Sequence, residues 1–113
     1  NNSLMDDKKF SELLVYNFET NKFKKILSNQ LESKNFKTET EGLADFSRDG
    51  SIMLEETNGG RILFYNEKGN LEWEFINVSN DGKIYPVSWA RLISNVKMVK
   101  NIKNSIENKK CLN

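Results

Sequence analysis

Three side chains in the second half of the chain have the chemistry to hold a ligand. Arg61 follows Asn58-Gly59-Gly60, and backbone N–H groups of such a turn can cradle an anion beside a guanidinium. Trp89 can stack on a planar ligand, and Arg91 can present a cation next to it. We therefore take Arg61, Trp89 and Arg91 as candidate ligand-binding residues. A tight hairpin turn explains the two glycines fully and is the simpler interpretation.

The composition argues against catalysis by this chain alone. It contains no histidine, which removes the usual general base near neutral pH and the commonest metal ligand. The single cysteine, Cys111, can form neither an intrachain disulfide nor a zinc site. Glu72 and Glu74 share a strand face, but a solvated face or a partner for Arg91 explains them better than a catalytic carboxylate pair. We predict no catalytic residue, no metal ligand and no cofactor.

Charge is balanced over the chain and concentrated at one end. Seventeen basic and 16 acidic residues give a net charge of +1. From Asn95 onward, five lysines accompany one glutamate, so this tail carries +4 and the rest −3. We expect no nucleic-acid partner for the chain and no membrane span, because no apolar run reaches about 18 residues. The tail has the charge to bind an acidic partner, nucleic acid or a membrane surface, but packing on its own sheet is the simplest expectation.

Alternating apolar residues and turn signals predict β-strands over most of the chain. A hairpin is expected from residues 11–18 and 23–27, followed by a connecting loop over 28–41 with room for one helical turn. Four further strands are expected at residues 43–46, 51–57, 61–66 and 71–77, which makes a meander. A fifth strand is predicted over 83–94, with Pro86 at an edge or a bulge.

The predicted core lies on alternate positions of these strands. It comprises Ile52, Leu54, Ile62, Phe64, Leu71, Trp73 and Phe75. The last three are expected on one strand face, whereas the adjacent Glu55 and Glu56 are expected on opposite faces. After the last strand, Val96, Val99, Ile102 and Ile106 have helical spacing, and Ser94 or Asn95 is a plausible N-cap.

A repeat indicates how these strands are organised. Tyr16-Asn17 and the hairpin around it return at Tyr65-Asn66, an offset of 49 residues. Hairpins that recur at about 40–50 residues are typical of β-propeller blades. The chain holds about one and a half blades, whereas a closed propeller needs about four to eight, so we expect a piece of a larger protein or association with further copies. Tyr16 and Tyr65 are expected in equivalent surroundings.

Residues 41–77 resemble a late blade of the arylsulfotransferase-type β-propellers. The matching features are Glu41-Gly42, Asp45, Asp49-Gly50, Gly60-Arg61-Ile62, the run Gly69-Asn70-Leu71-Glu72-Trp73-Glu74-Phe75, and Asn77. The resemblance implies a six-bladed parent that transfers a sulfuryl group between phenols through a histidine intermediate. Because this chain has no histidine, the resemblance carries over no catalytic residue. Arg61 and Arg91 are the arginines we consider for sulfate contact.

Together these features predict an all-β fold, an antiparallel meander of propeller-blade type with a C-terminal amphipathic helix. We expect an antiparallel β unit over residues 1–94 and a basic helix or tail over 95–113. The predicted function is that of a portion of an arylsulfotransferase-like propeller that is not catalytic by itself. The alternative is a binding or scaffold module that uses blade loops or the basic helix. Its partners would be the remaining blades, a self-associating copy, or another protein.

Overall fold

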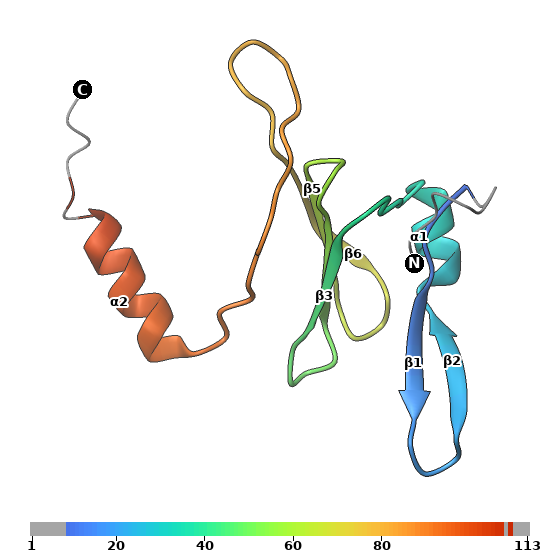
Figure 1. Cartoon of the computed structure of the whole chain (residues 1–113). Helices are drawn as coiled ribbons and strands as arrows, with labels where there is room; N and C mark the ends of the chain where they lie inside the picture. The colour runs from blue at the N-terminus through green and yellow to red at the C-terminus, as the bar shows by residue number, and fades with distance from the viewer. Residues whose placement is uncertain (1–8, 108, 110–113) are drawn as a thin grey trace.

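The computed structural model describes residues 9–107 and 109, which form two antiparallel sheets and two helices (Figure 1). A two-stranded sheet pairs β1 (Leu13–Asn17) with β2 (Lys22–Ile26). A four-stranded sheet has the order β3 (Gly42–Phe46), β4 (Ile52–Glu56), β5 (Arg61–Tyr65) and β6 (Leu71–Ile76). The predicted hairpin and meander are therefore confirmed as antiparallel sheets.

One helix lies between the two sheets in the sequence, and the other lies at the end of the described chain. The stretch predicted as a loop with room for a helical turn contains α1 (Ser28–Ser33), which buries Leu31. The predicted C-terminal helix is confirmed as α2 (Val96–Glu107). It is capped by Asn95, whose side-chain oxygen accepts a hydrogen bond from the Met98 N–H at 3.0 Å.

Two asparagines close the repeated hairpins through their side chains. The Asn17 side-chain oxygen accepts hydrogen bonds from the backbone N–H groups of residues 19 and 20, both at 2.9 Å. The Asn66 side-chain oxygen accepts from residues 68 and 70, at 3.1 and 3.0 Å, so the two turns share the first bond and differ in the second. Asparagine often closes turns through its own side chain. The repeat visible in the sequence is thus a repeat of turn chemistry.

The tyrosines that precede these asparagines do not share surroundings. The Tyr16 ring contacts Phe18 and Phe23 near the hairpin tip, with ring centroids 4.9 and 4.8 Å away. Tyr65 is 1 % exposed in the core. The prediction of equivalent surroundings is therefore wrong, because the tip of β1–β2 extends away from the four-stranded sheet (Figure 1). Phe18 at the tip is 85 % exposed.

A β-bulge in the β5–β6 ladder decides which side of the sheet each β6 side chain occupies. Trp73 pairs with Phe64, and Leu71 pairs with the next residue of β5, so Glu72 has no residue opposite it. An extra residue in one strand reverses the alternation of side chains beyond it. Leu71 therefore faces the core, whereas Trp73 and Phe75 face the other side. The prediction that these three share a face is wrong for this reason.

The core lies on one face of the four-stranded sheet, under α1 and the base of the first hairpin. Its buried members are Leu31, Phe36, Ile52, Leu54, Leu63 and Tyr65. Ile52 and Leu54 confirm the prediction. Trp73 and Phe75 contradict it, since they are 42 % and 47 % exposed.

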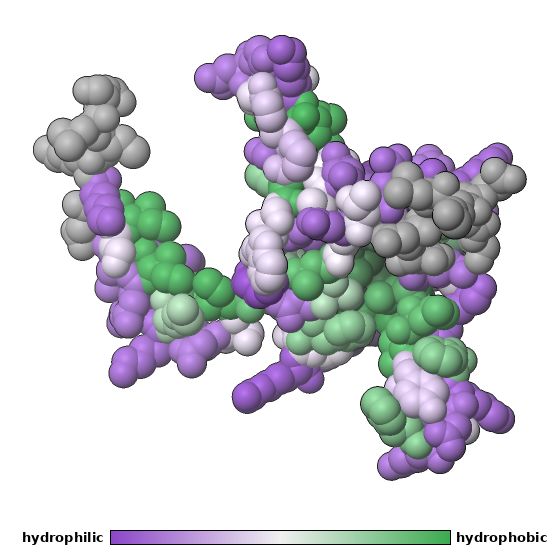
Figure 2. All heavy atoms as spheres, in the orientation of Figure 1, coloured by the Kyte–Doolittle hydropathy of each residue, from purple (hydrophilic) through white to green (hydrophobic). Residues whose placement is uncertain are grey.

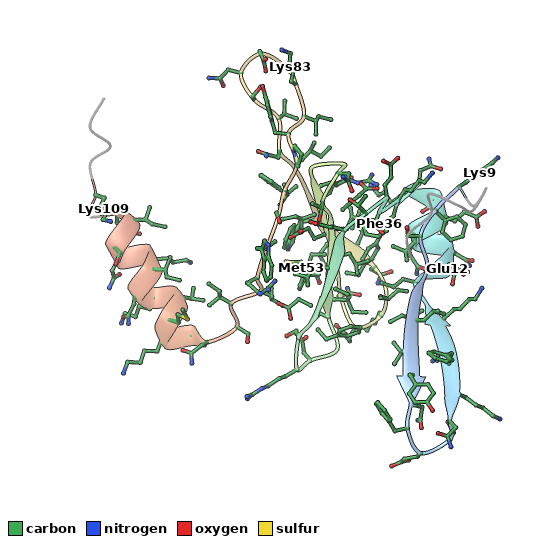
Figure 3. The ribbon with its side chains drawn as sticks, viewed as in Figure 1. Lys9, Glu12, Phe36, Met53, Lys83 and Lys109 are labelled. Atoms are coloured by element: carbon green, nitrogen blue, oxygen red, sulfur yellow. The ribbon has the colours of Figure 1, made fainter. Side chains whose placement is uncertain are left out.

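The predicted fifth strand over residues 83–94 is wrong. Apart from one isolated bridge between Val78 and Ile84, this segment pairs with no strand. Trp89 has a φ of 63°, which is incompatible with an extended ladder. The backbone N–H groups that follow it bond to side-chain carboxylates of β3 and β4 instead. We call residues 87–92 the strap; Lys83 lies at the tip of the loop that precedes it (Figure 3).

Packing of the basic helix on its own sheet is also wrong. In Figure 1, α2 stands apart from both sheets at the end of the strap. No residue of α2 is buried. Of its predicted apolar face, Val96, Ile102 and Ile106 are exposed and Val99 is half-buried within the described chain.

Candidate functional site

A pocket of about 530 Å³ opens at the edge of the four-stranded sheet formed by β3. We call it the Trp89 pocket. The segment before β1, the linker from α1 to β3 and the strap form its walls. Its lining includes Ser11, Glu12, Leu13, Leu31, Phe36, Thr38, Thr40, Glu41, Gly42, Leu43, Ala44, Leu54, Glu55, Thr57, Ser88, Trp89 and Arg91. Two of the three candidate ligand-binding residues thus meet at one site.

A buried carboxylate forms part of the lining and fixes the strap. Glu55 is 2 % exposed, and its side chain accepts hydrogen bonds at both oxygens. The Thr57 hydroxyl donates to Oε1 at 2.8 Å, and the Ala90 backbone N–H donates to Oε2 at 2.6 Å. A buried carboxylate requires such partners to offset its lost hydration. Glu55 therefore positions the residue between Trp89 and Arg91.

Two further hydrogen bonds hold the ends of the strap. The Leu92 N–H donates to Oδ2 of Asp45 at 3.1 Å, and the Val87 N–H donates to the Thr57 carbonyl oxygen at 3.2 Å. The strap is thus fixed at three backbone positions without joining the sheet. Neither anchoring carboxylate belongs to the predicted site. Their strand positions were visible in the sequence, but their partners lie 35 and 47 residues away.

Trp89 and Arg91 form the exposed side of the pocket. The Arg91 guanidinium carbon lies 5.2 Å from the centroid of a Trp89 ring, which is within the range of a cation–π contact. One guanidinium nitrogen, Nη1, donates to the Ala90 carbonyl oxygen at 2.9 Å. Trp89 is 78 % exposed and has a left-handed backbone. Such a conformation is unfavourable for a bulky residue and occurs more often at functional sites.

The opposite wall is tied together by two small hydroxyl side chains. Ser11 is 3 % exposed and Thr38 is 7 % exposed, and their hydroxyl oxygens lie 3.2 Å apart. The Thr38 N–H donates to the Ser11 hydroxyl at 3.0 Å, and the Ser11 N–H donates to the Phe36 carbonyl oxygen at 2.7 Å. The pocket therefore has a fixed polar wall beside the apolar side chains of the core.

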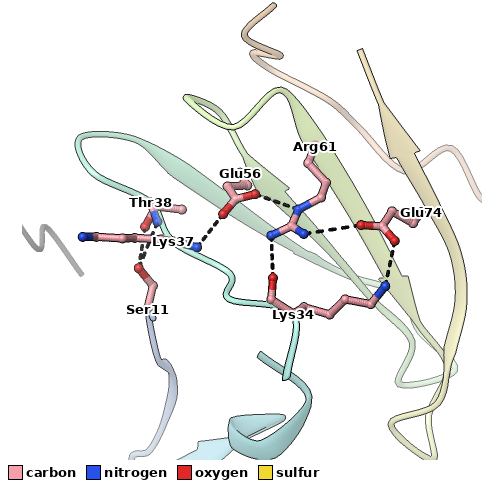
Figure 4. Close-up of polar contacts among 7 residues, drawn as sticks. All are labelled: Ser11, Lys34, Lys37, Thr38, Glu56, Arg61 and Glu74. Carbon is pink, nitrogen blue, oxygen red and sulfur yellow. Dashed lines mark hydrogen bonds and ion pairs between the residues drawn. The ribbon is translucent and has the colours of Figure 1, made fainter. Parts of the chain in front are cut away.

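Arg61, the third candidate, lies outside this pocket in a polar network under α1 (Figure 4). Its Nε donates to Glu56 Oε2 at 2.7 Å, and its Nη1 donates to Glu74 Oε1 at 3.4 Å. Its Nη2 donates to the Lys34 carbonyl oxygen at 3.0 Å. All three guanidinium nitrogens thus have internal acceptors. Ligand binding by Arg61 stays a prediction, and its observed contacts join β4, β5, β6 and the end of α1.

The same network perturbs one carboxyl group. Lys34 Nζ donates to Glu74 Oε2 at 2.7 Å. This hydrogen bond is the main reason that the pKa of Glu74 lies below its usual value, and the charges of Lys34 and Arg61 add to it, against the opposing effect of burial. Glu56 accepts from Arg61 and from the Lys37 N–H, whereas Glu55 points to the strap. The predicted opposite orientation of Glu55 and Glu56 is confirmed.

The turn before Arg61 has a structural explanation. Gly60 has a φ of 60°, and a Cβ at this residue would lie 2.2 Å from the Tyr85 carbonyl oxygen. The Asn77 N–H donates to the Gly60 carbonyl oxygen at 2.8 Å. Gly60 is therefore required for the close approach of the chain after β6. An anion nest at this turn stays a prediction.

Metal-type clusters and membrane-spanning helices are both absent from the described residues. Among residues 9–107 and 109, no group of three or more His, Cys, Asp and Glu side chains has the geometry of a metal site. Within this same part of the chain, neither helix is both long and apolar enough to cross a membrane. The Trp89 pocket offers an aromatic ring, a guanidinium, hydroxyls, apolar side chains and the carboxyl groups of Glu12, Glu41 and Glu55.

Comparison with known proteins identifies no relative: no family model, curated protein or solved structure matches this chain.

Proposed function

We propose that the chain is a non-catalytic, ligand-binding portion of a β-propeller protein of the arylsulfotransferase type. In this proposal the Trp89 pocket holds a small aromatic anion, such as an aryl sulfate. The observation that carries it is the position of Trp89 and Arg91 together at the pocket, fixed by the bond from the intervening N–H to buried Glu55. Cationic and aromatic groups side by side suit a planar ligand with a negative substituent.

The lining carries one guanidinium, on Arg91, and three carboxylates, on Glu12, Glu41 and Glu55, and these charges would orient such a ligand. Both Glu55 oxygens already accept hydrogen bonds, and its charge disfavours an anion beside it. Arg91 uses one nitrogen for the Ala90 carbonyl and forms no ion pair with any residue in the described chain. The anionic group would therefore bind Arg91, and the ring would contact Trp89 and the apolar lining near Leu31 and Phe36.

The blade assignment has independent support from the strands. A four-stranded antiparallel meander is the unit of a propeller blade, and β3–β6 forms one. The preceding hairpin closes with a related asparagine turn, since Asn17 and Asn66 each accept from the N–H two residues on. Its aromatic tip is exposed, with Phe23 at 69 %, as expected of a hairpin whose neighbouring strands belong to the rest of a larger protein.

Titration with an aryl sulfate tests the binding proposal. With 4-nitrophenyl sulfate as the probe, we expect saturable quenching of tryptophan fluorescence, confirmed by calorimetry. Arg91→Gln and Trp89→Ala should each weaken binding by roughly tenfold or more, because each removes a contact worth on the order of 1–2 kcal/mol. Arg48→Gln, which removes an exposed arginine outside the pocket lining, is the matched control. Equal binding by Arg91→Gln and the original chain would refute the site.

A protein-binding role is the second candidate. Besides the hairpin tip, Trp73 and Phe75 expose aromatic surface on the sheet face away from the core. Analytical ultracentrifugation shows whether the chain associates with itself. Concentration-dependent self-association favours a scaffold that completes its sheets with further copies. A monomer at all concentrations rules out self-association.

A further inference from the structure

We propose that α2 binds the surface of an anionic lipid bilayer, lying in the interface without crossing it. No residue of this helix is buried, and most of its apolar side chains are exposed in the described chain. Ile106 is 67 % exposed, Met98 52 % and Ile102 37 %. In Figure 2 apolar side chains run along one side of this helix, in the gap between it and the strap.

The spacing of its residues makes α2 two-sided. With about 100° of rotation per residue, Met98, Val99, Ile102 and Ile106 fall within an arc of about 100°. Lys103 lies beside this arc, whereas Lys97 and Lys100 lie on the far side. A basic polar face opposite an apolar face is the pattern of helices that lie in the membrane interface. The lysine stems are long enough to reach headgroups while their ammonium groups stay hydrated.

Charge selects the kind of surface. Val96–Glu107 contains three lysines and one glutamate, and Lys109 follows. Pairing α2 with the same helix of a second copy would cover the apolar arc but leave Lys97 and Lys100, on the far side, without an acidic partner. Nucleic acid would neutralise the lysines but leave the apolar arc in water. An anionic bilayer satisfies both faces, since it attracts the lysines and takes up the apolar side chains.

Length gives a further reason for a partner surface. A helix of 12 residues that packs on nothing is marginal in water, and the single cap at Asn95 is too small a contribution to change this. Binding at an interface stabilises such a helix, because the apolar face is then removed from water. We therefore expect the helix content of the chain to rise when anionic vesicles are present.

Flotation of the full chain with lipid vesicles tests this proposal. One vesicle preparation contains phosphatidylcholine alone, and the other contains 30 % phosphatidylglycerol. We expect binding to the anionic vesicles at least tenfold stronger than to the neutral ones, weakened by high salt. Each lysine near an anionic surface contributes roughly fivefold. The triple change of Lys97, Lys100 and Lys103 to Gln should therefore reduce binding by on the order of a hundredfold.

Two variants separate this mechanism from general charge attraction. Lys22→Gln, Lys24→Gln and Lys68→Gln together remove the same charge from exposed sites outside α2, and should leave most of the binding. Ile102→Asn keeps every lysine but interrupts the apolar arc, and should reduce binding by roughly tenfold. The proposal is overturned if neither vesicle binds, if both bind equally, or if the control triple loses as much as the α2 triple.

Discussion

Arg61 and Glu56 lie opposite each other in the β4–β5 ladder and form an ion pair at 2.7 Å on the core side of the sheet. The side chain of Glu56 is 8 % exposed and that of Arg61 is 17 % exposed. The pair also anchors residues outside the sheet, because Glu56 accepts from the Lys37 N–H and Arg61 donates to the Lys34 carbonyl oxygen. It thereby attaches the end of α1 to the sheet beside the core.

Replacing Arg61 by methionine should destabilise the chain by about 3 kcal/mol, because Glu56 would remain buried without its charged partner. Chemical denaturation monitored by circular dichroism measures this change. Arg61→Lys should recover only part of the loss, since lysine cannot reach three acceptors with a planar fork. Arg48→Gln at an exposed turn should change stability by less than about 0.5 kcal/mol. A fully stable Arg61→Met variant would show that the network is dispensable.

The pKa of Glu74 predicts a pH dependence of stability. The lowered pKa, due first to the Lys34 hydrogen bond, means that the folded state favours the ionised carboxylate. This contribution is complete above the unfolded pKa, near 4.5, and is lost as the pH falls through the lower folded value. Glu74→Gln should therefore cost up to about 1 kcal/mol at pH 7. Urea denaturation at pH 7 and at pH 3 should show this difference shrinking at the lower pH.

Glu72→Gln is the matched control for this experiment, because Glu72 is exposed at the bulge and contributes to no ion pair in the described chain. Its stability relative to the original chain should change little between the two pH values. A Glu74→Gln effect that stays constant with pH would contradict the assigned role of the carboxylate.

Gly60→Ala should destabilise the chain by at least about 2 kcal/mol, since its Cβ would collide with the Tyr85 carbonyl oxygen in addition to straining a positive φ. Gly82 is a matched control, because it also has a positive φ, 78°, but a Cβ added there would have no neighbouring atom within 4 Å. Gly82→Ala should cost only about 1 kcal/mol. Thermal unfolding of both variants measures the difference. Equal losses of stability would show that the close approach to Tyr85 does not contribute to the cost of Gly60→Ala.

Local features of this fold were predictable from the sequence, and long-range ones were not. Asn17 and Asn66 close turns through atoms two to four residues away, so the short sequence around each is sufficient. The bulge at Glu72 changes which face Trp73 occupies without leaving a mark in the alternating pattern.

In the candidate site, too, the residue types were predictable from the sequence and the long-range contacts were not. The chemistry of Trp89 and Arg91 marked them as ligand-binding candidates, and the fold places both at one pocket. The strap that carries them was predicted as a strand. Its backbone N–H groups donate instead to the side chains of Asp45 and Glu55, which are far away in the sequence, and these bonds could not be predicted. Arg61 has the residue type of an anion site, yet its neighbours in space provide acceptors for its guanidinium.

The two repeated tyrosines predict opposite effects of removing a hydroxyl. The Tyr65 hydroxyl is buried and has no hydrogen-bond partner among the described residues, and burial raises its pKa. A buried polar group without a partner opposes folding, so Tyr65→Phe should leave stability unchanged or raise it by up to about 1 kcal/mol. The Tyr16 hydroxyl donates to the Asn21 side-chain oxygen at 2.8 Å, so Tyr16→Phe should cost about 0.5 kcal/mol. Urea denaturation of both variants measures the two signs, with Leu63→Ala as a core control expected to cost about 2–5 kcal/mol. A large loss in Tyr65→Phe would mean that its hydroxyl has a partner in solution, such as a buried water.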